Sequence, residues 1–120
     1  MKYLESFNDN QYTIIERIDM TNGIEFSKYE IDKIYPILKE YDFSLDYLSS
    51  DNIIVFNHDD LSKIIIRIKK SDDDFYYIKI WIDKINKSSK HNRYQVITFY
   101  KCDQLLGIKK CLKNEIPKII

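Results

Sequence analysis

Apolar and polar residues alternate along three runs in the second half of the chain. The runs cover residues 63–69, 75–82 and 93–100. Alternation with a period of two is typical of strands that bury one face. Short polar turns between successive runs favour antiparallel neighbours over parallel ones. We therefore predict an antiparallel meander sheet in this half.

Shorter apolar runs earlier in the chain predict further strands. Residues 43–47 alternate, and residues 53–57 are mostly apolar. Residues 11–20 fit both a strand and one face of a helix. We favour the strand because the turn-forming residues 21–23 follow it. The sequence thus predicts four to five strands, preceded by a polar and loosely ordered segment at 1–10.

Two segments follow the helical period instead. The S-x-x-E pattern at Ser27 predicts a capped helix start, and the apolar spacing continues to Glu40. Pro36 inside this helix predicts a kink. A second helix is expected to be capped by Asp103 and to end at Pro117. We expect this C-terminal helix and the kinked one to pack on one face of the sheet.

The length and composition fit one domain. A chain of 120 residues of which 44% are hydrophobic can bury one ordinary core. We predict a single α+β domain over residues 1–120. The first residues lack the apolar run of a signal peptide, and no stretch approaches the roughly 18 apolar residues that span a bilayer. We therefore expect a cytoplasmic protein without a membrane partner.

The charge balance hides an asymmetry. Nineteen basic residues match nineteen acidic ones, so the net charge does not favour a polyanionic partner. Residues 1–60, however, carry five bases against thirteen acids, a net charge of −8, and residues 61–120 carry +8. Two interpretations stay open. The halves neutralise each other where they pack, or the basic strands present a positive face of their own.

The alternation also sorts side chains between the two faces of the sheet. Isoleucines gather on one face, which we expect to be the core. The other face combines aromatic and basic side chains: Arg67, Lys69, Tyr77, Lys79 and Trp81. Aromatic anchors favour a protein interface, whereas rings interleaved with cations also suit single-stranded nucleic acid. A third interpretation is that these residues form ordinary cross-strand pairs or lie under the N-terminal segment.

The composition excludes several catalytic motifs. Gly23 and Gly107 are the only glycines, so the chain cannot contain a P-loop, a GxGxxG dinucleotide site or a G-x-S-x-G nucleophile elbow. The polar clusters at 58–60 and 72–74 are interpreted as solvated turns rather than as metal sites. His91 is expected to be exposed in a lysine-rich loop. We expect neither a bound metal nor a cofactor.

The two cysteines are interpreted as free thiols. Cys102 and Cys111 have neither the spacing nor the number of ligands of a structural zinc site. Cys111 falls on the apolar side of its helix, which predicts a buried thiol. Cys102 is expected just before a helix N-terminus, where a thiolate is stabilised, but no histidine has an evident route to it. We therefore expect a protein that is not an enzyme.

Short motifs stand at both ends of the chain. Residues 1–4 read MKYL and are followed by Phe7-Asn8, whereas residues 99–104 read FYKCDQ and are followed by Gly107 and by KCL at 110–112. These motifs resemble those of uncharacterised small proteins from tailed phages and AT-rich marine bacteria. The resemblance implies an accessory phage-like protein inside a bacterial cell. Small proteins of that kind often bind a host component.

These observations predict a small binding or regulatory protein. Its aromatic and basic sheet face, or an edge strand, would hold a protein partner. The alternative is a nucleic-acid-binding module that uses the same face. Only three arginines are present, which argues against sequence-specific reading of bases. A homodimer also stays open.

Overall fold

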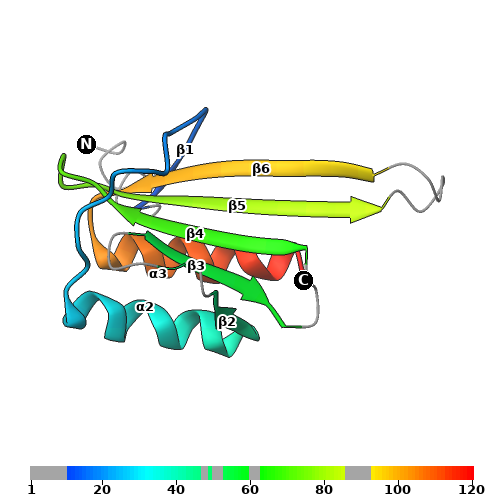
Figure 1. Cartoon of the computed structure of the whole chain (residues 1–120), viewed down its shortest axis with the longest axis horizontal. Coiled ribbons are helices and arrows are strands. Elements are labelled where there is room, and N and C mark those ends of the chain that lie inside the picture. Colours follow the sequence, from blue (N-terminus) through cyan, green and yellow to red (C-terminus); the bar gives the residue numbers. More distant parts are fainter. Residues whose placement is uncertain (1–10, 47–48, 50–52, 60–62, 86–92) are drawn as a thin grey trace, which may run out of the picture.

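Six antiparallel strands form one sheet in the order β1-β6-β5-β4-β3-β2 (Figure 1). The computed structural model describes residues 11–46, 49, 53–59, 63–85 and 93–120, so the segment at 1–10 and His91 lie outside the described residues. The strands are β1 (Thr13–Ile15), β2 (Phe43–Leu45), β3 (Ile53–His58), β4 (Ile64–Lys70), β5 (Tyr76–Ile85) and β6 (Arg93–Cys102). The antiparallel meander from β2 to β6 is confirmed. The predicted count of four to five strands is too low, whereas the strand favoured within residues 11–20 is present as β1, which joins the edge of the sheet beside β6.

Both helices cover the same face of this sheet. They are α2 (Lys28–Glu40) and α3 (Leu105–Glu115), and a short 3-10 turn, η1 (Ile116–Lys118), follows α3. Figure 1 shows the two helices side by side along one face of the strands. The predicted isoleucine face is buried beneath them, at Ile64, Ile66, Ile68, Ile78, Ile80 and Ile82. Each of these side chains stabilises the fold by roughly 2 kcal/mol, so the period-two pattern located the main core correctly.

The start of α2 agrees with its sequence pattern. Ser27 Oγ accepts a hydrogen bond of 3.2 Å from the Glu30 amide, and Glu30 Oε1 accepts one of 2.8 Å from the Ser27 amide. This is a complete capping box, which satisfies two amides that would otherwise lack partners. The helix then continues through Pro36 to Glu40.

The start of α3 differs from the prediction. Its N-cap is Gln104, which makes no side-chain cap bond, so the predicted cap at Asp103 is wrong. Close packing holds this helix start instead. A Cβ atom added to Gly107 would lie 2.5 Å from the carbonyl oxygen of Gln11 and 2.6 Å from Cβ of Cys102. Glycine therefore allows the first turn of α3 to approach the end of β6.

A segment that we call the strap, residues 16–24, connects β1 to the region before α2. It crosses the outer face of the sheet, which is the face away from the helices. The carbonyl oxygen of Asp19 accepts a hydrogen bond of 2.7 Å from Lys69 Nζ. The amide of Ile24 donates a 2.8 Å hydrogen bond to the carbonyl of Lys70, the last residue of β4. The strap therefore covers one end of the outer face.

One edge of the sheet is only partly paired. β5 and β6 pair along their full length, from Tyr76 opposite Cys102 to Ile85 opposite Arg93. On the other side of β6, β1 pairs only with the residues from Phe99 to Lys101. Figure 1 shows β6 continuing well past the short β1. Among the residues that the structure describes, none pairs with this side of β6 at 93–98, which we call the free β6 edge.

Candidate binding surface on the outer sheet face

The sheet places all five predicted site residues on its outer face. Arg67 on β4 lies directly opposite Lys79 on β5, and Lys69 lies directly opposite Tyr77. Trp81 follows Lys79 two positions along β5, so that its side chain lies on the same face. None of the five belongs to the main core cluster under the helices. The alternation therefore assigned these side chains to the correct face.

Two of the five are not available for binding a partner. Lys69 is 6% exposed and Tyr77 is 4% exposed, because the strap lies over this end of the face. Lys69 Nζ donates to the Asp19 carbonyl, and the Tyr77 hydroxyl donates to Asp73 Oδ2 over 2.6 Å. Burial, together with this bond to Asp73, raises the pKa of Tyr77 to about 12. The interpretation that the N-terminal segment covers the face is correct for this pair.

Arg67 and Lys79 remain accessible beside the strap, in a groove of about 620 Å³. The strap supplies one wall of the groove, and β4, β5 and β6 supply its floor. We call it the cationic groove. It is lined by Arg17, Ile18, Asp19, Met20, Thr21, Arg67, Lys79 and Phe99.

Three cations line this groove without acidic partners. Arg17, Arg67 and Lys79 form no ion pair with any residue in the described part of the chain. The one carboxylate in the lining is that of Asp19, whose Oδ1 accepts 2.9 Å and 2.7 Å hydrogen bonds from the amide and hydroxyl of Thr21. These bonds hold the pKa of Asp19 below its ordinary value. The groove therefore carries three positive charges and one negative charge.

The pKa of Lys79 reflects the proximity of these charges. Burial lowers the pKa of Lys79, and the like charge of Arg67 lowers it further. The Lys79 ammonium also lies 5.8 Å from the centre of the Trp81 ring. The groove therefore combines cations with an aromatic neighbour on the side away from the strap.

An apolar strip continues from the groove to the free β6 edge. Trp81 lies opposite Ile65 on β4 and opposite Ile97 on β6. Ile97 is 47% exposed, and the other two are partly exposed. The indole Nε1 of Trp81 is buried and has no hydrogen-bond partner in the structure. This strip and the free edge form one continuous surface.

Sequence reasoning missed part of this surface. Arg17 lies in the stretch at 11–20, where the pattern was ambiguous, and nothing local indicates that it folds over β4 and β5. Phe99 could have been assigned to this surface from the sequence, because it lies two positions from Ile97 on the same face of β6. It also lies opposite Lys79. The free edge depends on the three-residue length of β1, which the pattern does not reveal.

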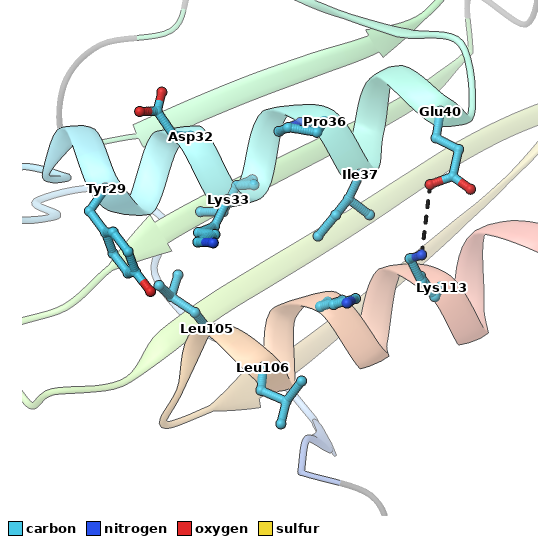
Figure 2. Close-up of a pocket in the computed structure, with 11 residues that line it drawn as sticks. Tyr29, Asp32, Lys33, Pro36, Ile37, Glu40, Leu105, Leu106 and Lys113 are labelled. Carbon is cyan, nitrogen blue, oxygen red and sulfur yellow. Dashed lines mark ion pairs between the residues drawn. The ribbon is translucent and has the colours of Figure 1, made fainter.

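A second concave surface lies between the helices and is drawn in Figure 2. Its volume is about 520 Å³, and it is lined by residues of α2 and α3 that include Tyr29, Ile37 and Leu106. An exposed ion pair between Glu40 and Lys113 closes one end at 3.7 Å. Its lining combines charged side chains of both helices, such as Lys33 and Lys109, with apolar ones. This arrangement is typical of the groove between any two packed helices.

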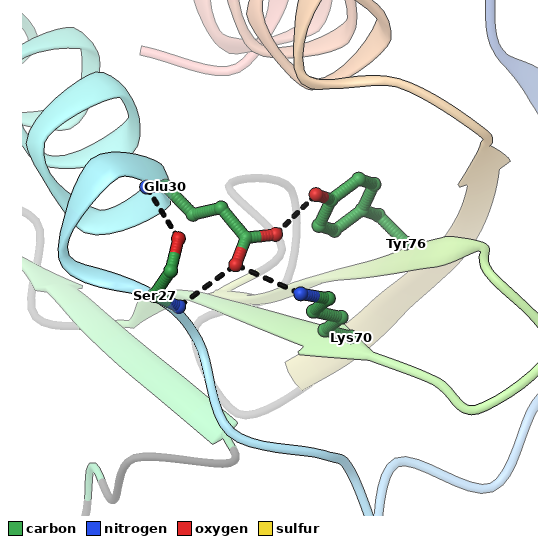
Figure 3. Close-up of polar contacts among 4 residues, drawn as sticks. All are labelled: Ser27, Glu30, Lys70 and Tyr76. Atoms are coloured by element: carbon green, nitrogen blue, oxygen red, sulfur yellow. Dashed lines mark hydrogen bonds and ion pairs between the residues drawn. The ribbon is translucent and has the colours of Figure 1, made fainter.

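A polar cluster around the buried Glu30 joins α2 to the end of β4 and the start of β5, as Figure 3 shows. Glu30 Oε1 lies 2.9 Å from Lys70 Nζ, and Glu30 Oε2 accepts a hydrogen bond from the Tyr76 hydroxyl. Burial alone would raise the pKa of Glu30, but the hydrogen bonds from Tyr76, Ser27 and Lys70 outweigh it and lower this pKa to about 2. Both carboxylate oxygens are therefore occupied by partners from the protein. We assign the cluster a structural role.

The ion pairs also bear on the asymmetry of charge along the chain. Glu30 pairs with Lys70, and Glu40 pairs with Lys113. Each pair joins an acid of the first half to a base of the second. At these two places the halves neutralise each other, whereas the cationic groove retains its charge.

Other candidate residues take structural positions. His58 was expected in a solvated turn, but it is the last residue of β3 and is buried with its ring 5.0 Å from that of Phe43. Cys111 is fully buried, as predicted. Cys102 is the last residue of β6, and burial raises its pKa to about 12, so the expected stabilised thiolate is wrong. The cluster at 72–74 forms the predicted turn, in which Asp73 accepts a bond from the Phe75 amide.

In the described residues, no three His, Cys, Asp or Glu side chains gather as a metal site would require. No described helix has the length and apolar character that crossing a membrane requires. Comparison of the chain with protein-family models, with curated proteins and with solved structures finds no match in any of the three.

Proposed function

We propose that the protein is a non-enzymatic binding protein that adds an extended segment of a partner protein to the free β6 edge. The observation that carries this proposal is the mismatch in length between β1 and β6. Three residues of β1 cover only Phe99 to Lys101, and β6 extends six residues further to Arg93. An unpaired strand edge presents amides and carbonyls that an added strand can satisfy.

The composition of this edge supports a binding role. Natural proteins usually protect open edges with charged side chains, proline or bulges. Residues 95–98 read Gln-Val-Ile-Thr and contain none of these. Val96 is 41% exposed and Ile97 is 47% exposed, and they lie on opposite faces of the strand. Arg93 at its far end is the one charged residue of this edge. At 95–98 the edge therefore presents two exposed apolar side chains, and no described residue pairs with it.

The surface beside the edge indicates what kind of segment would bind. An added strand would place every second side chain on the outer face, next to Ile97 and the adjoining ring of Trp81. The intervening side chains would lie near Val96. Main-chain hydrogen bonds would supply affinity, and these apolar neighbours would supply selectivity. The partner is therefore expected to present an extended segment with apolar residues at alternate positions.

The resemblance to small phage proteins would make this partner a component of a bacterial host. The alternative, a nucleic-acid-binding module on the same face, has less support. Lys69 is buried, which leaves a compact cluster of cations instead of a stripe that could follow a phosphate backbone.

Peptide selection with amide exchange tests the proposal. Peptides selected from a random library against the whole protein are expected to slow hydrogen exchange at residues 93–98. An Ile97→Lys variant should bind them at least roughly tenfold more weakly, because a charge would oppose the apolar contact. Leu106→Lys is the matched control, since Leu106 is similarly exposed at 45% but lies on α3. Protection confined to the groove between the helices, or equal binding by both variants, would contradict the proposal.

Self-association gives a further outcome. If the free edge binds a second copy of the chain, sedimentation will show a concentration-dependent dimer that Ile97→Lys abolishes. That result would assign the edge to a homodimer and overturn the proposal of a separate partner.

A further inference from the structure

The cationic groove is electrostatically unfavourable when empty. Arg67 and Lys79 lie directly opposite each other in register, and like charges in that position destabilise a sheet. Arg17 brings a third positive charge to the same groove. None of the three forms an ion pair with a described residue, and the one carboxylate in the lining, that of Asp19, offsets only one of the three charges. A bound anion would relieve this repulsion.

The charges present specify what kind of anion fits. With Asp19 included, the lining carries a net charge of +2. A phosphate monoester carries close to −2 at neutral pH, whereas a carboxylate carries −1. Two guanidinium groups can each donate two hydrogen bonds to phosphate oxygens, and the lysine adds a point charge. Charge and donor geometry therefore match a terminal phosphate.

The size and walls of the groove indicate a small ligand. A volume of about 620 Å³ is in the range of small-molecule sites. Phe99 lies opposite Lys79 in the floor, so a flat ring attached to the phosphate could pack against its side chain. The strap closes one side, and Lys69 beyond it is buried on the Asp19 carbonyl. The cations thus end at the strap instead of continuing along the face.

We infer that the cationic groove binds the terminal phosphate of a small phosphorylated ligand, such as a mononucleotide, with Arg17, Arg67 and Lys79 as its phosphate ligands. This site is separate from the free β6 edge and does not depend on the function proposed for that edge. The two can therefore be tested apart.

Calorimetric titration with adenosine 5′-monophosphate, inorganic phosphate and adenosine tests the inference. The monophosphate is expected to bind saturably, phosphate more weakly, and adenosine not at all. Affinity for the monophosphate should fall as pH drops below about 6, where the phosphate gains a proton. Sulfate keeps its charge over this range, so its binding should not show that loss.

Substitutions test which side chains hold the phosphate. Arg67→Gln and Lys79→Gln should each weaken monophosphate binding roughly tenfold or more, as the loss of a charge-assisted hydrogen bond implies. Lys109→Gln, at an exposed position on α3, should leave binding unchanged. Thermal unfolding of each variant checks that it folds, and Arg67→Lys, which keeps the charge but loses the fork, should bind with intermediate strength.

Three results would overturn the inference. The first is the absence of saturable binding by both the monophosphate and phosphate. The second is equal affinity in the Arg67, Lys79 and Lys109 variants. The third is tighter binding of a ten-nucleotide single strand without a terminal phosphate than of the monophosphate, which would assign the groove to a nucleic-acid backbone.

Discussion

Arg67 on β4 and Lys79 on β5 lie directly opposite each other on the outer face of the sheet, so that two positive charges occupy one cross-strand pair. No other pairing of the described strands places two charged residues opposite each other. Neither member of this pair forms an ion pair with a carboxylate of the described residues.

Removing one of these charges should stabilise the protein. We expect Lys79→Thr to raise the free energy of unfolding by about 0.5 kcal/mol, because the repulsion in a direct cross-strand pair disappears. Urea denaturation at low ionic strength measures the change. Added salt should reduce the difference between the variant and the parent, since it screens the repulsion. A loss of stability at low salt would show that Lys79 has a stabilising partner.

Glu30→Gln should destabilise the protein strongly at neutral pH. The carboxylate is buried and has partners on Ser27, Lys70 and Tyr76, so its replacement removes charge-assisted bonds and leaves Lys70 unpaired. The pKa of Glu30 falls from 4.5 to about 2 in the folded protein. This shift corresponds to about 3 kcal/mol, which is the decrease in the free energy of unfolding that we expect. Glu40→Gln is the control, because the Glu40 pair with Lys113 is exposed. Equal effects of the two substitutions in urea denaturation would contradict the structural role of the cluster.

The same cluster predicts a dependence of stability on pH. The pKa of Glu30 is lower in the folded state than in the unfolded state. The contribution of Glu30 to the free energy of unfolding is therefore complete above about pH 4.5 and is lost as the pH falls toward 2. Unfolding free energies measured from pH 6 to pH 2 should decrease in the parent protein and decrease less in Glu30→Gln. Parallel curves would indicate that Glu30 is not the group responsible.

Gly107→Ala should destabilise the protein although alanine favours helices. Alanine gains about 1 kcal/mol over glycine in a helix interior. Its Cβ, however, would lie within 2.6 Å of both the Gln11 carbonyl and Cys102, and overpacking of this kind costs about 1–3 kcal/mol. Lys109→Ala, at an exposed position of α3, should be nearly neutral. Thermal unfolding of the two variants distinguishes a packing requirement from a propensity effect.

The two thiols should be unreactive in the folded protein. Cys102 and Cys111 are buried, and burial raises the pKa of Cys102 to about 12. At pH 8 the thiolate that reacts with disulfide reagents is therefore scarce as well as inaccessible. A chromogenic thiol reagent should label both cysteines in urea and neither in native buffer, whereas Leu106→Cys should react at once. Rapid native labelling of the parent would show that α3 opens readily from the sheet.

Local patterns were sufficient for much of the fold. The capping box at Ser27 and the isoleucine alternation each depend on residues a few positions apart, and both predictions are confirmed. Errors arose where packing decided the outcome. Asp103 has the right side chain for a cap, yet α3 begins at Leu105 with Gln104 as its N-cap, at a point where Gly107 packs closely against Cys102 of β6. His58 resembles a turn residue in sequence, but β3 extends to include it.

The candidate surface could be predicted only in part. Alternation placed Arg67, Lys79 and Trp81 on the outer face, but it could not show which side chains the strap would cover. The bond between Lys69 and Asp19 joins residues fifty positions apart, and no local pattern encodes such a contact. The short length of β1, which opens the edge of β6, is likewise decided by where the strap turns away.

The pairing of Ile15 with Phe99 has a consequence for biosynthesis. Chains grow from the amino end, so the first strand leaves the ribosome long before its partner has been made. The groove needs both the strap and Phe99 on β6, so a product that terminates before residue 99 would lack it. The groove can therefore assemble only after translation has passed residue 99.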